Sequence, residues 1–503
     1  TGRAYATLGA EQEYFLIDRN FYEARIDLMQ TGRTLFGREP AKHQQMADHY
    51  FGAIKSRVIA FMEDLDHEMW KLGVPVTTRH NEVAPGQYEV APVFESLNLG
   101  VDHNMLLMEV MQKIAEKHGL ACLLHEKPFA GVNGSGKHNN WSIVGPDGKN
   151  WLAPGDNPHE NAKFLVVLAA VIKAVDTWAP ALRASVASAA NDHRLGSHEA
   201  PPAIISIFLG DQLTDIIEQI EKGSVKSSKK GGVLRVGVDS LPELPQDATD
   251  RNRTSPFAFT GSKFEFRASG SSQSLAGPNL ILNTIVADAL DEICTELEAV
   301  DKKDFNTAVQ KLLQKIIKKH KRILFNGDNY TEEWVKEAEK RGLANLKTSP
   351  EAHEFMKTKA VIDLFEKHQV LSKVELISRY DVYQEMYNTV IDYEGRLASN
   401  MVKTMYIPAV VSYQDELATS IKASEGITGK KNTQQRKLLG DIVALAEKAL
   451  SIADKLDGAI EKGDATKIKA AMTALRSPID ELEGLTPEDR WPVPTYAEML
   501  FMY

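Results

Sequence analysis

Apolar and polar positions follow different periodicities in the first and second parts of the chain. Up to about residue 290, short segments of alternating apolar and polar residues are separated by frequent glycine and proline, which is typical of antiparallel strands joined by turns. Apolar residues at helical spacing interrupt these segments at residues 46–72, 97–118 and 162–179. We therefore predict an α+β fold for residues 1–290, with an antiparallel sheet and flanking helices.

Strand signals almost vanish from residue 291 onward. Apolar residues recur there at helical spacing, and breaks such as Asn326-Gly327 and Gly463 separate the helical segments. These segments are residues 305–324, 331–341, 350–368, 374–404, 432–456 and 464–482. The pattern predicts a C-terminal helical bundle over residues 291–503, which we expect to supply scaffold and subunit contacts.

Two glutamates lie close together in the first predicted strand. Glu11 and Glu13 are two residues apart and precede an apolar run, so on a strand they share one face of a largely buried element. Like charges on a buried face repel and are costly to desolvate unless a cation lies between them. This pair indicates either a metal site or, alternatively, a solvated strand edge.

Two further acids flank a turn signal. Glu82 and Glu89 lie on either side of Pro85-Gly86, which predicts the two arms of a hairpin or tight loop. A pair of surface acids is the alternative interpretation.

Two more segments alternate polar residues with apolar or aromatic ones. The first follows a glycine-rich loop able to bring its backbone close to a ligand, and the second has Phe264 and Phe266 on its opposite face, towards a core. A cross-strand ladder of ion pairs is the alternative for the second segment. The polar-face residues are His138, Asn140, Ser142, Lys263, Glu265 and Arg267. Residues 131–137 fit a P-loop, but His138 stands where its Ser or Thr belongs, so we reject that motif.

Composition and charge exclude several classes of protein. The net charge of −10 argues against a chain-wide nucleic-acid binder, whose affinity would come from lysine and arginine. With two cysteines there is no disulfide framework, and a reducing cytoplasm is the default. The longest apolar run, residues 164–172, is shorter than the roughly 20 residues that span a bilayer. We therefore expect a cytoplasmic protein with neither a nucleic-acid nor a membrane partner.

Together these segments contain ligands for hard cations and groups for anions. Five glutamates and one histidine form an oxygen-rich donor set with a single imidazole, which favours Mg²⁺ or Mn²⁺ over structural zinc. Nearby arginines and lysines suit phosphates or carboxylates, and no activated cysteine or serine nucleophile is evident. Such a site fits phosphoryl transfer, in which metals and guanidinium groups neutralise developing charge.

The order and spacing of these segments resemble glutamine synthetase, most closely its large type III bacterial branch. The matching motifs are E-Q-E at 11–13, N-E-V-A-P-G-Q-Y-E-V at 81–90, K-P and N-G-S-G-K-H between 127 and 138, R-L-G-S-H-E-A-P at 194–201, and N-R-T-S and K-F-E-F-R between 252 and 267. The resemblance covers about residues 5–290. It implies that residues 1–290 hold the metal, ATP and glutamate sites.

The resemblance also implies a reaction and an assembly. ATP, glutamate and ammonia would give glutamine, ADP and phosphate through a γ-glutamyl phosphate, with two or more Mg²⁺ or Mn²⁺ ions per site. The assembly would be a homo-oligomer of stacked rings, a dodecamer, with sites shared between subunits. A γ-glutamyl ligase acting on another amine and a non-catalytic oligomeric scaffold are the alternatives. Family members carry an N-terminal domain before E-x-E, and because this chain opens with Thr1 on a strand-like stretch, we expect it to lack that domain.

The resemblance implies a role for a residue of this chain only where that residue matches the family's motif. The implied metal ligands are Glu13, Glu82 and Glu89 for one ion and Glu11, His138 and Glu265 for the second. The implied glutamate-binding residues are Asn133, Gly134, Arg194 and Arg267, with Glu13 beside them. Arg253 matches a phosphate-binding arginine, and Glu199 matches the glutamate that closes the site and helps form the ammonium pocket; with Arg267 these are the implied catalytic residues. Ser142, Asn140, Arg253 and Lys263 would contact the nucleotide.

Overall fold

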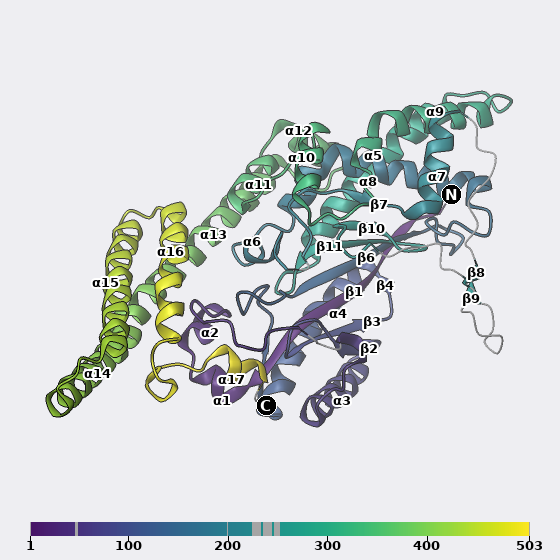
Figure 1. The fold of residues 1–503 in the computed structure, drawn as a ribbon. Coiled ribbons are helices and arrows are strands. Elements are labelled where there is room, and N and C mark those ends of the chain that lie inside the picture. The colour runs from purple at the N-terminus through teal and green to yellow at the C-terminus, as the bar shows by residue number, and fades with distance from the viewer. Residues whose placement is uncertain are drawn as a thin grey trace.

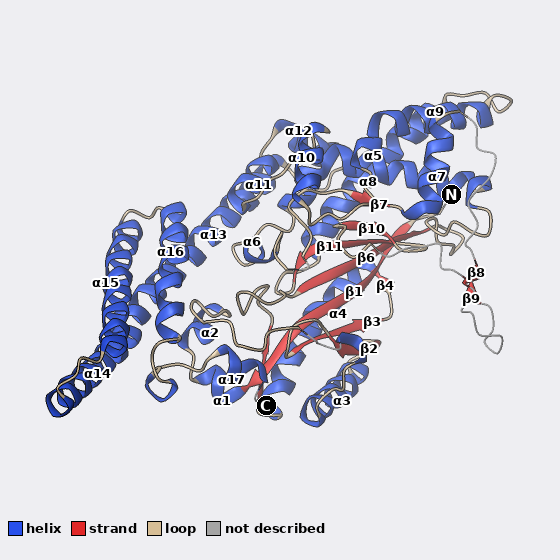
Figure 2. Cartoon of the chain, in the orientation of Figure 1, coloured by secondary structure: helices blue, strands red, loops and turns tan. Residues whose placement is uncertain are grey.

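The computed structural model describes residues 2–45, 49–198, 200–223 and 252–501, together with the backbone of a short strand pair, β8 (Val233–Leu234) and β9 (Leu244–Pro245). The described part has the expected α+β architecture, with one large sheet flanked by helices and a helical C-terminal region (Figures 1 and 2).

Among the described residues, the large sheet carries nine strands in the order β2-β3-β1-β6-β11-β10-β7, with β4 and β5 paired to β1. All pairs are antiparallel except β10 with β7. The strands are β1 (Tyr5–Asp18), β2 (Val76–Asn81), β3 (Gln87–Pro92), β4 (Glu95–Ser96), β5 (Leu120–Leu123), β6 (Gly136–Val144), β7 (Ile207–Phe208), β10 (Phe257–Phe259) and β11 (Phe264–Gly270). The long strand β1 therefore contacts four neighbours.

Helices α3 (Ser56–Lys71) and α4 (Leu97–Lys117) cover one face of the sheet around β1. Tyr14 and Leu16 of β1 pack there into a core that includes Phe61 and Met111. Because side chains alternate along a strand, Glu11 and Glu13 lie on the opposite face. Within the predicted segment 46–72, helix α3 begins only at Ser56, because the residue before it, Lys55, has an extended backbone.

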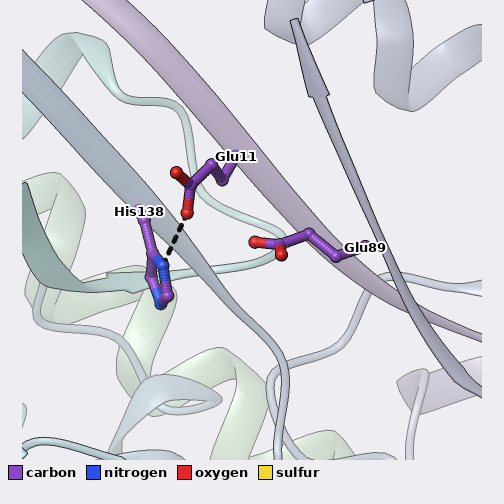
Figure 3. Close-up of side chains that lie close together, drawn as sticks. All are labelled: Glu11, Glu89 and His138. Carbon is purple, nitrogen blue, oxygen red and sulfur yellow. Dashed lines mark hydrogen bonds and ion pairs between the residues drawn. The ribbon is translucent and has the colours of Figure 1, made fainter. Parts of the chain in front are cut away.

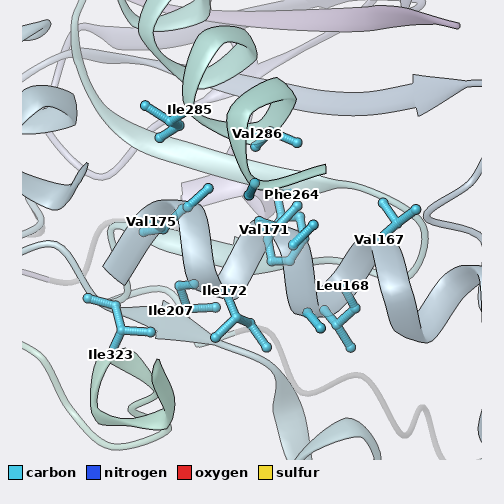
Figure 4. Close-up of a cluster of buried hydrophobic side chains, with 14 of the residues drawn as sticks. Val167, Leu168, Val171, Ile172, Val175, Ile207, Phe264, Ile285, Val286 and Ile323 are labelled. Atoms are coloured by element: carbon cyan, nitrogen blue, oxygen red, sulfur yellow. The ribbon is translucent and has the colours of Figure 1, made fainter. Parts of the chain in front are cut away.

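A second core lies where α5 (Ala162–Ala184) and α8 (Ala276–Glu298) pack against β10 and β11 (Figure 4). Phe264 and Phe266, the apolar face of the predicted strand, are fully buried in it. Helix α5 is long and apolar enough to cross a membrane by length and composition, but 72% of its apolar window is buried inside the structure. The apolar character of α5 is therefore explained by its place at the centre of a core.

The C-terminal region is helical, as predicted. Helices α9 to α12 lie near α5 and α8, whereas α13 runs away from the sheet to a bundle with α14, α15 and α16 (Figure 1). These helices are α9 (Phe305–His320), α10 (Glu332–Lys340), α11 (Ser349–Met356), α12 (Lys359–Lys367), α13 (Lys373–Met401), α14 (Ile407–Thr428), α15 (Thr433–Glu461) and α16 (Ala465–Glu483). The boundary at residue 290 stays a prediction.

The shorter helices connect these layers. They are α1 (Arg19–Glu23), α2 (Ile26–Thr31), α6 (Asn191–Arg194), α7 (Gly210–Glu221), α17 (Tyr496–Phe501) and the 3₁₀ turns η1 (His49–Phe51), η2 (Pro158–Glu160), η3 (Lys321–Ile323) and η5 (Glu488–Arg490). Helix α17 packs beside β1, so the last described residues lie close to the first strand (Figure 1).

Two helix predictions differ from the structure. The segment 350–368 is two helices, because Thr358 adopts an extended backbone between α11 and α12. The segment 374–404 continues through a π-helical turn, η4 (Val402–Tyr406), into α14, which the sequence pattern missed. Pro408 lies in the first turn of α14 and has no backbone N–H to donate. The chain stays helical there because the π turn before it shifts the hydrogen-bond pattern.

Candidate active site

Strand register brings the predicted polar residues into one band across the sheet. Glu13 of β1 pairs with Glu89 of β3, and Glu11 of β1 pairs with His138 of β6. Further along, Asn140 of β6 pairs with Glu265 of β11. Directly paired residues point to the same face of a sheet, with Cβ atoms about 5 Å apart. Five of the six residues expected to bind metal therefore lie side by side.

His138 lies at the centre of the first group of ligands. Its Nδ1 atom lies 2.8 Å from Glu11 Oε2 and 3.2 Å from Glu265 Oε1, and its Nε2 atom lies 3.7 Å from Glu13 Oε1. Burial alone would lower the pKa of His138, but hydrogen bonds with Glu11 and Glu265 hold it well above its usual value. Ligand atoms of Glu11, Glu89 and His138 all lie within 4.8 Å of one another, and the three side chains converge (Figure 3).

A second group forms where β2 and β3 meet. Ligand atoms of His80, Glu82 and Glu89 lie within 4.8 Å of one another. His80 Nε2 lies 2.9 Å from Glu89 Oε2, and His80 Nδ1 lies 3.5 Å from Glu82 Oε1. We did not predict His80 from the sequence. Its spacing of two residues from Glu82 is the same as that between Glu11 and Glu13, and this alternation is the signal that could have found it.

The acids of this site are held in an environment that disfavours their charge. Burial, followed by the nearby Glu13 and Glu89 carboxylates, raises the pKa of Glu82 to about 9. Burial and the Glu11 carboxylate raise the pKa of Glu89 well above its usual value. Glu89 Oε1 is buried and has no hydrogen-bond partner among the described residues. These raised pKa values and this orphaned oxygen fit a hard divalent cation, which would neutralise the acids and complete their coordination.

A pocket of 280 Å³ adjoins the metal-site candidates at Glu11. Asn140, Ser142 and Lys263, which we expected to contact the nucleotide, all line it, together with the apolar Val93 and Phe94. The Asn140 carboxamide is held between Glu11 and Lys263. Its Nδ2 donates to Glu11 Oε1 at 2.8 Å, and its Oδ1 accepts from Lys263 Nζ. Two residues of β6 and the distant Lys263 thus share one pocket.

The residues expected to bind glutamate lie around the loop between β5 and β6. Asn133 is buried there, and the buried Arg194 guanidinium donates to the carbonyl oxygens of Ser269 at 3.3 Å and Arg267 at 3.1 Å. A Cβ at Gly136 would lie 2.1 Å from Arg194 Nη2. A Cβ at Gly134 would lie 2.4 Å from a backbone oxygen. Glycine is required at position 134 because the clash there is with backbone, whereas a side chain at position 136 would displace the Arg194 guanidinium.

The remaining predicted residues flank this band. Arg267 is buried, and its Nε donates to Glu265 Oε1 at 2.8 Å. Arg253 is exposed, and its guanidinium lies 5.3 Å from the centre of the Tyr50 ring. Glu199 lies outside the described residues.

Two sequence profiles match this chain. The profile of the glutamine synthetase catalytic domain matches residues 2–206, and that of the glutamine synthetase C-terminal domain matches residues 308–425. The type-3 glutamine synthetase of Dictyostelium discoideum is 46% identical over 521 residues, covering 99% of this chain and 70% of that protein. The chain belongs to the glutamine synthetase family.

Two bacterial relatives agree with this membership. The glutamine synthetase of Butyrivibrio fibrisolvens is 46% identical over 99% of this chain and 73% of that protein. The glutamine synthetase of Bacteroides fragilis is 41% identical over 99% of this chain and 72% of that protein. The resemblance to the type III glutamine synthetases is thereby confirmed. The second profile also places part of the helical region within the family.

We expect the stability of the metal-free protein to fall as the pH rises above about 4.5. Glu82 has a folded-state pKa of about 9 against an ordinary 4.5, so between these values the folded state binds more protons than the unfolded state. Stability is then lost with rising pH, by up to about 1.4 kcal/mol per pH unit for one such group. Urea unfolding between pH 6 and 9, with EDTA and with saturating Mg²⁺, measures this slope.

Mg²⁺ should make the free energy of unfolding depend less on pH, because a bound cation favours the charged carboxylates. Glu82→Gln should do the same without metal, since this variant removes the titrating group. A slope that Glu82→Gln leaves unchanged would show that the carboxyl of Glu82 does not carry the pH dependence.

Proposed function

We propose that the polar band on the sheet catalyses the ATP-dependent ligation of ammonia to L-glutamate, with γ-glutamyl phosphate as the intermediate and the residue roles set out below. As a member of its family, the chain is an ATP- and divalent-metal-dependent ligase that forms glutamine. The observation that carries the proposal is the convergence of carboxylates and imidazoles from neighbouring strands beside the 280 Å³ pocket.

Two bound cations would explain why five glutamates lie together in this site. Glu13, Glu82 and Glu89 would hold one ion near the glutamate, and Glu11, His138 and Glu265 would hold the second near the ATP phosphates. Bound Mg²⁺ or Mn²⁺ would polarise the phosphate and neutralise the charge that develops in transfer. The contacts of Glu11 and Glu265 with His138, those of Glu82 and Glu89 with His80, and the oxygen-rich donor set support two cation positions. Glu89 lies between them, because its ligand atom is within 4.8 Å of those of both groups.

The first half of the reaction transfers the γ-phosphoryl group. In it, an oxygen of the substrate γ-carboxylate attacks the γ-phosphorus, and the bond from that phosphorus to ADP breaks. Ser142, Asn140 and Lys263 would orient the nucleotide in the pocket that they line. Arg253 would bind the transferring phosphate, and Arg267 would stabilise its charge in the transition state. The burial of Arg267 on β11 and its hydrogen bond to Glu265 support this role.

The second half forms the amide. Ammonia attacks the acyl carbon of the intermediate, and phosphate leaves. Asn133, Gly134 and Arg194 would hold the glutamate part of the intermediate, while Glu199 would close the site and form part of the ammonium pocket. The buried Arg194 Nε atom, which has no hydrogen-bond partner among the described residues, supports its role in binding an anion.

We also propose that the working enzyme is a cytoplasmic homo-oligomer of stacked rings, a dodecamer, with sites shared between subunits and with neither a nucleic-acid nor a membrane partner. The assembly is what the resemblance of the sequence motifs implies, and the net charge of −10 supports the absence of a nucleic-acid partner.

An amine-competition assay tests this function. Purified protein with glutamate, ATP, ammonium and Mg²⁺ or Mn²⁺ should form glutamine, ADP and phosphate in equal amounts, and omission of any one component should stop the reaction. Methylamine and ethylamine should compete poorly. Preference for an alkyl amine would indicate a γ-glutamyl ligase of different specificity, and absence of ATP turnover would indicate a non-catalytic scaffold.

A further inference from the structure

The segment between α2 and α3 connects two sides of the candidate active site. At one end, Thr34 donates both its backbone N–H and its hydroxyl to the carbonyl oxygen of Pro128, at 2.8 and 2.7 Å. At the other end, Asn81 Nδ2 donates to the carbonyl oxygen of Gly52 at 2.8 Å. Pro128 precedes the glutamate-binding loop, and Asn81 precedes Glu82. We call residues 34–45 and 49–52 the bridging segment.

Within the bridging segment, Gln44 pairs with Asn133 through two hydrogen bonds. Gln44 Nε2 donates to Asn133 Oδ1 at 3.0 Å, and Gln44 Oε1 accepts from the Asn133 backbone N–H at 3.1 Å. A carboxamide combines a donor and an acceptor at its end, and this pairing uses both. It sets the orientation of the Asn133 carboxamide, which is buried and cannot readily find replacement partners in water.

Tyr50, further along the bridging segment, contacts the other side of the site. Its ring lies 5.3 Å from the Arg253 guanidinium and meets the His80 ring edge to face, with ring centres 4.7 Å apart. A guanidinium is attracted to the face of an aromatic ring, and this attraction does not need the phenol hydroxyl. His80 in turn contacts Glu82 and Glu89. The Tyr50 ring thus joins the proposed phosphate-binding arginine to the acids of one cation position.

We propose that Gln44 and Tyr50 are positioning residues for glutamine formation. Gln44 acts through Asn133 on the binding of glutamate, and Tyr50 acts through Arg253 and His80 on phosphoryl transfer. This inference rests on the proposed function and adds to it two residues outside the predicted site. Because the two residues act on different parts of the site, their loss should change different kinetic constants.

Gln44 is tested by two substitutions in the full-length protein. Gln44→Ala removes both hydrogen bonds, and we expect the KM for glutamate to rise about tenfold while kcat and the KM for ATP change less than about twofold. Gln44→Glu has the same size and can accept from the Asn133 N–H but cannot donate to Asn133 Oδ1, so it should resemble Gln44→Ala. Gln45→Ala is the matched control, because Gln45 is exposed and its Oε1 accepts from the neighbouring His43 N–H at 2.9 Å.

Tyr50 is tested by a variant that keeps the ring and one that removes it. Tyr50→Phe should keep kcat within about twofold, because the ring face attracts the guanidinium, whereas Tyr50→Leu should lower kcat about tenfold and leave the KM for glutamate unchanged. If the Tyr50 hydroxyl had a structural role, kcat of Tyr50→Phe would fall as well. Thermal melting of each variant monitors folding.

The outcomes separate this inference from the function on which it rests. If the unaltered protein forms no glutamine, both are overturned. If it is active and the Gln44 variants leave the KM for glutamate unchanged, or if Tyr50→Phe and Tyr50→Leu behave alike, only the positioning roles are overturned. Gln44→Glu with wild-type kinetics would overturn the role assigned to the hydrogen bond from Gln44 Nε2 to the Asn133 carboxamide.

Discussion

Glutamine formation should fall roughly 1000-fold when Glu265 is replaced by glutamine. Glu265 Oε1 lies 3.2 Å from His138 Nδ1 and 2.8 Å from Arg267 Nε, so its carboxylate joins a proposed metal ligand to a proposed catalytic arginine. A metal ion that polarises a phosphoryl oxygen contributes several kcal/mol to transition-state stabilisation, and each 1.4 kcal/mol is about tenfold in rate. Glutamine keeps the size of the side chain but removes the charge that a cation requires.

The measurement is steady-state glutamine formation over a range of Mg²⁺ and Mn²⁺ concentrations, with calorimetric titration of Mn²⁺ into the same variant. Metal affinity should fall with activity. Glu109→Gln is the control, because the Glu109 side chain on α4 is 60% exposed and pairs with Lys113 at 2.7 Å. Wild-type metal affinity in Glu265→Gln would remove Glu265 from the set of ligands.

Local periodicity explains which parts of this site could be predicted. Glu11 and Glu13, like His138 and Asn140, are two residues apart, and a strand places such pairs on one face whatever its neighbours are. Which strands are neighbours is a non-local property. The pairing of Glu13 with Glu89, and of Asn140 with Glu265, depends on register across the sheet and could not be derived from alternation alone.

The same distinction explains what was missed. Gln44 lies just before the apolar pattern of residues 46–72 and Tyr50 lies within it, but that pattern carries no sign of chemistry. Both residues reach the site through contacts with residues far away in sequence, Asn133 and Arg253. Helix α14 was missed for a different reason. Its first turn contains Pro408, which usually marks a helix end, and only the π turn before it keeps the chain helical.

The substitution of Arg267 by lysine should lower kcat about 100-fold while changing the KM for ATP only a few-fold. The buried Arg267 guanidinium donates from Nε to Glu265 at 2.8 Å and from Nη1 to the carbonyl oxygens of Ser255, at 3.4 Å, and Asn252. Lysine keeps the positive charge but has no planar fork, so it cannot hold these partners and a phosphate at once. Loss of one preorganised donor to a transition state typically lowers kcat by about 100-fold or more.

Metal titration separates the two ways in which Arg267 could act. The Arg267 guanidinium orients the Glu265 carboxylate through the 2.8 Å hydrogen bond from Nε, so losing this contact should also weaken metal binding at Glu265. Excess Mg²⁺ would restore that part of the loss. It would not restore a contact that strengthens only in the transition state, and we therefore expect kcat to stay low at saturating metal.

Arg183→Lys is the matched control for this prediction. The Arg183 guanidinium is equally buried, donates to Asp192 at 3.1 Å and to the carbonyl oxygen of Leu346 at 2.9 Å, and lies outside the proposed site. This variant should lower the melting temperature without lowering kcat. If Arg267→Lys instead loses ATP affinity and kcat equally, Arg267 binds the ground state and the transition state alike, and its role is to bind ATP rather than to stabilise the transferring group.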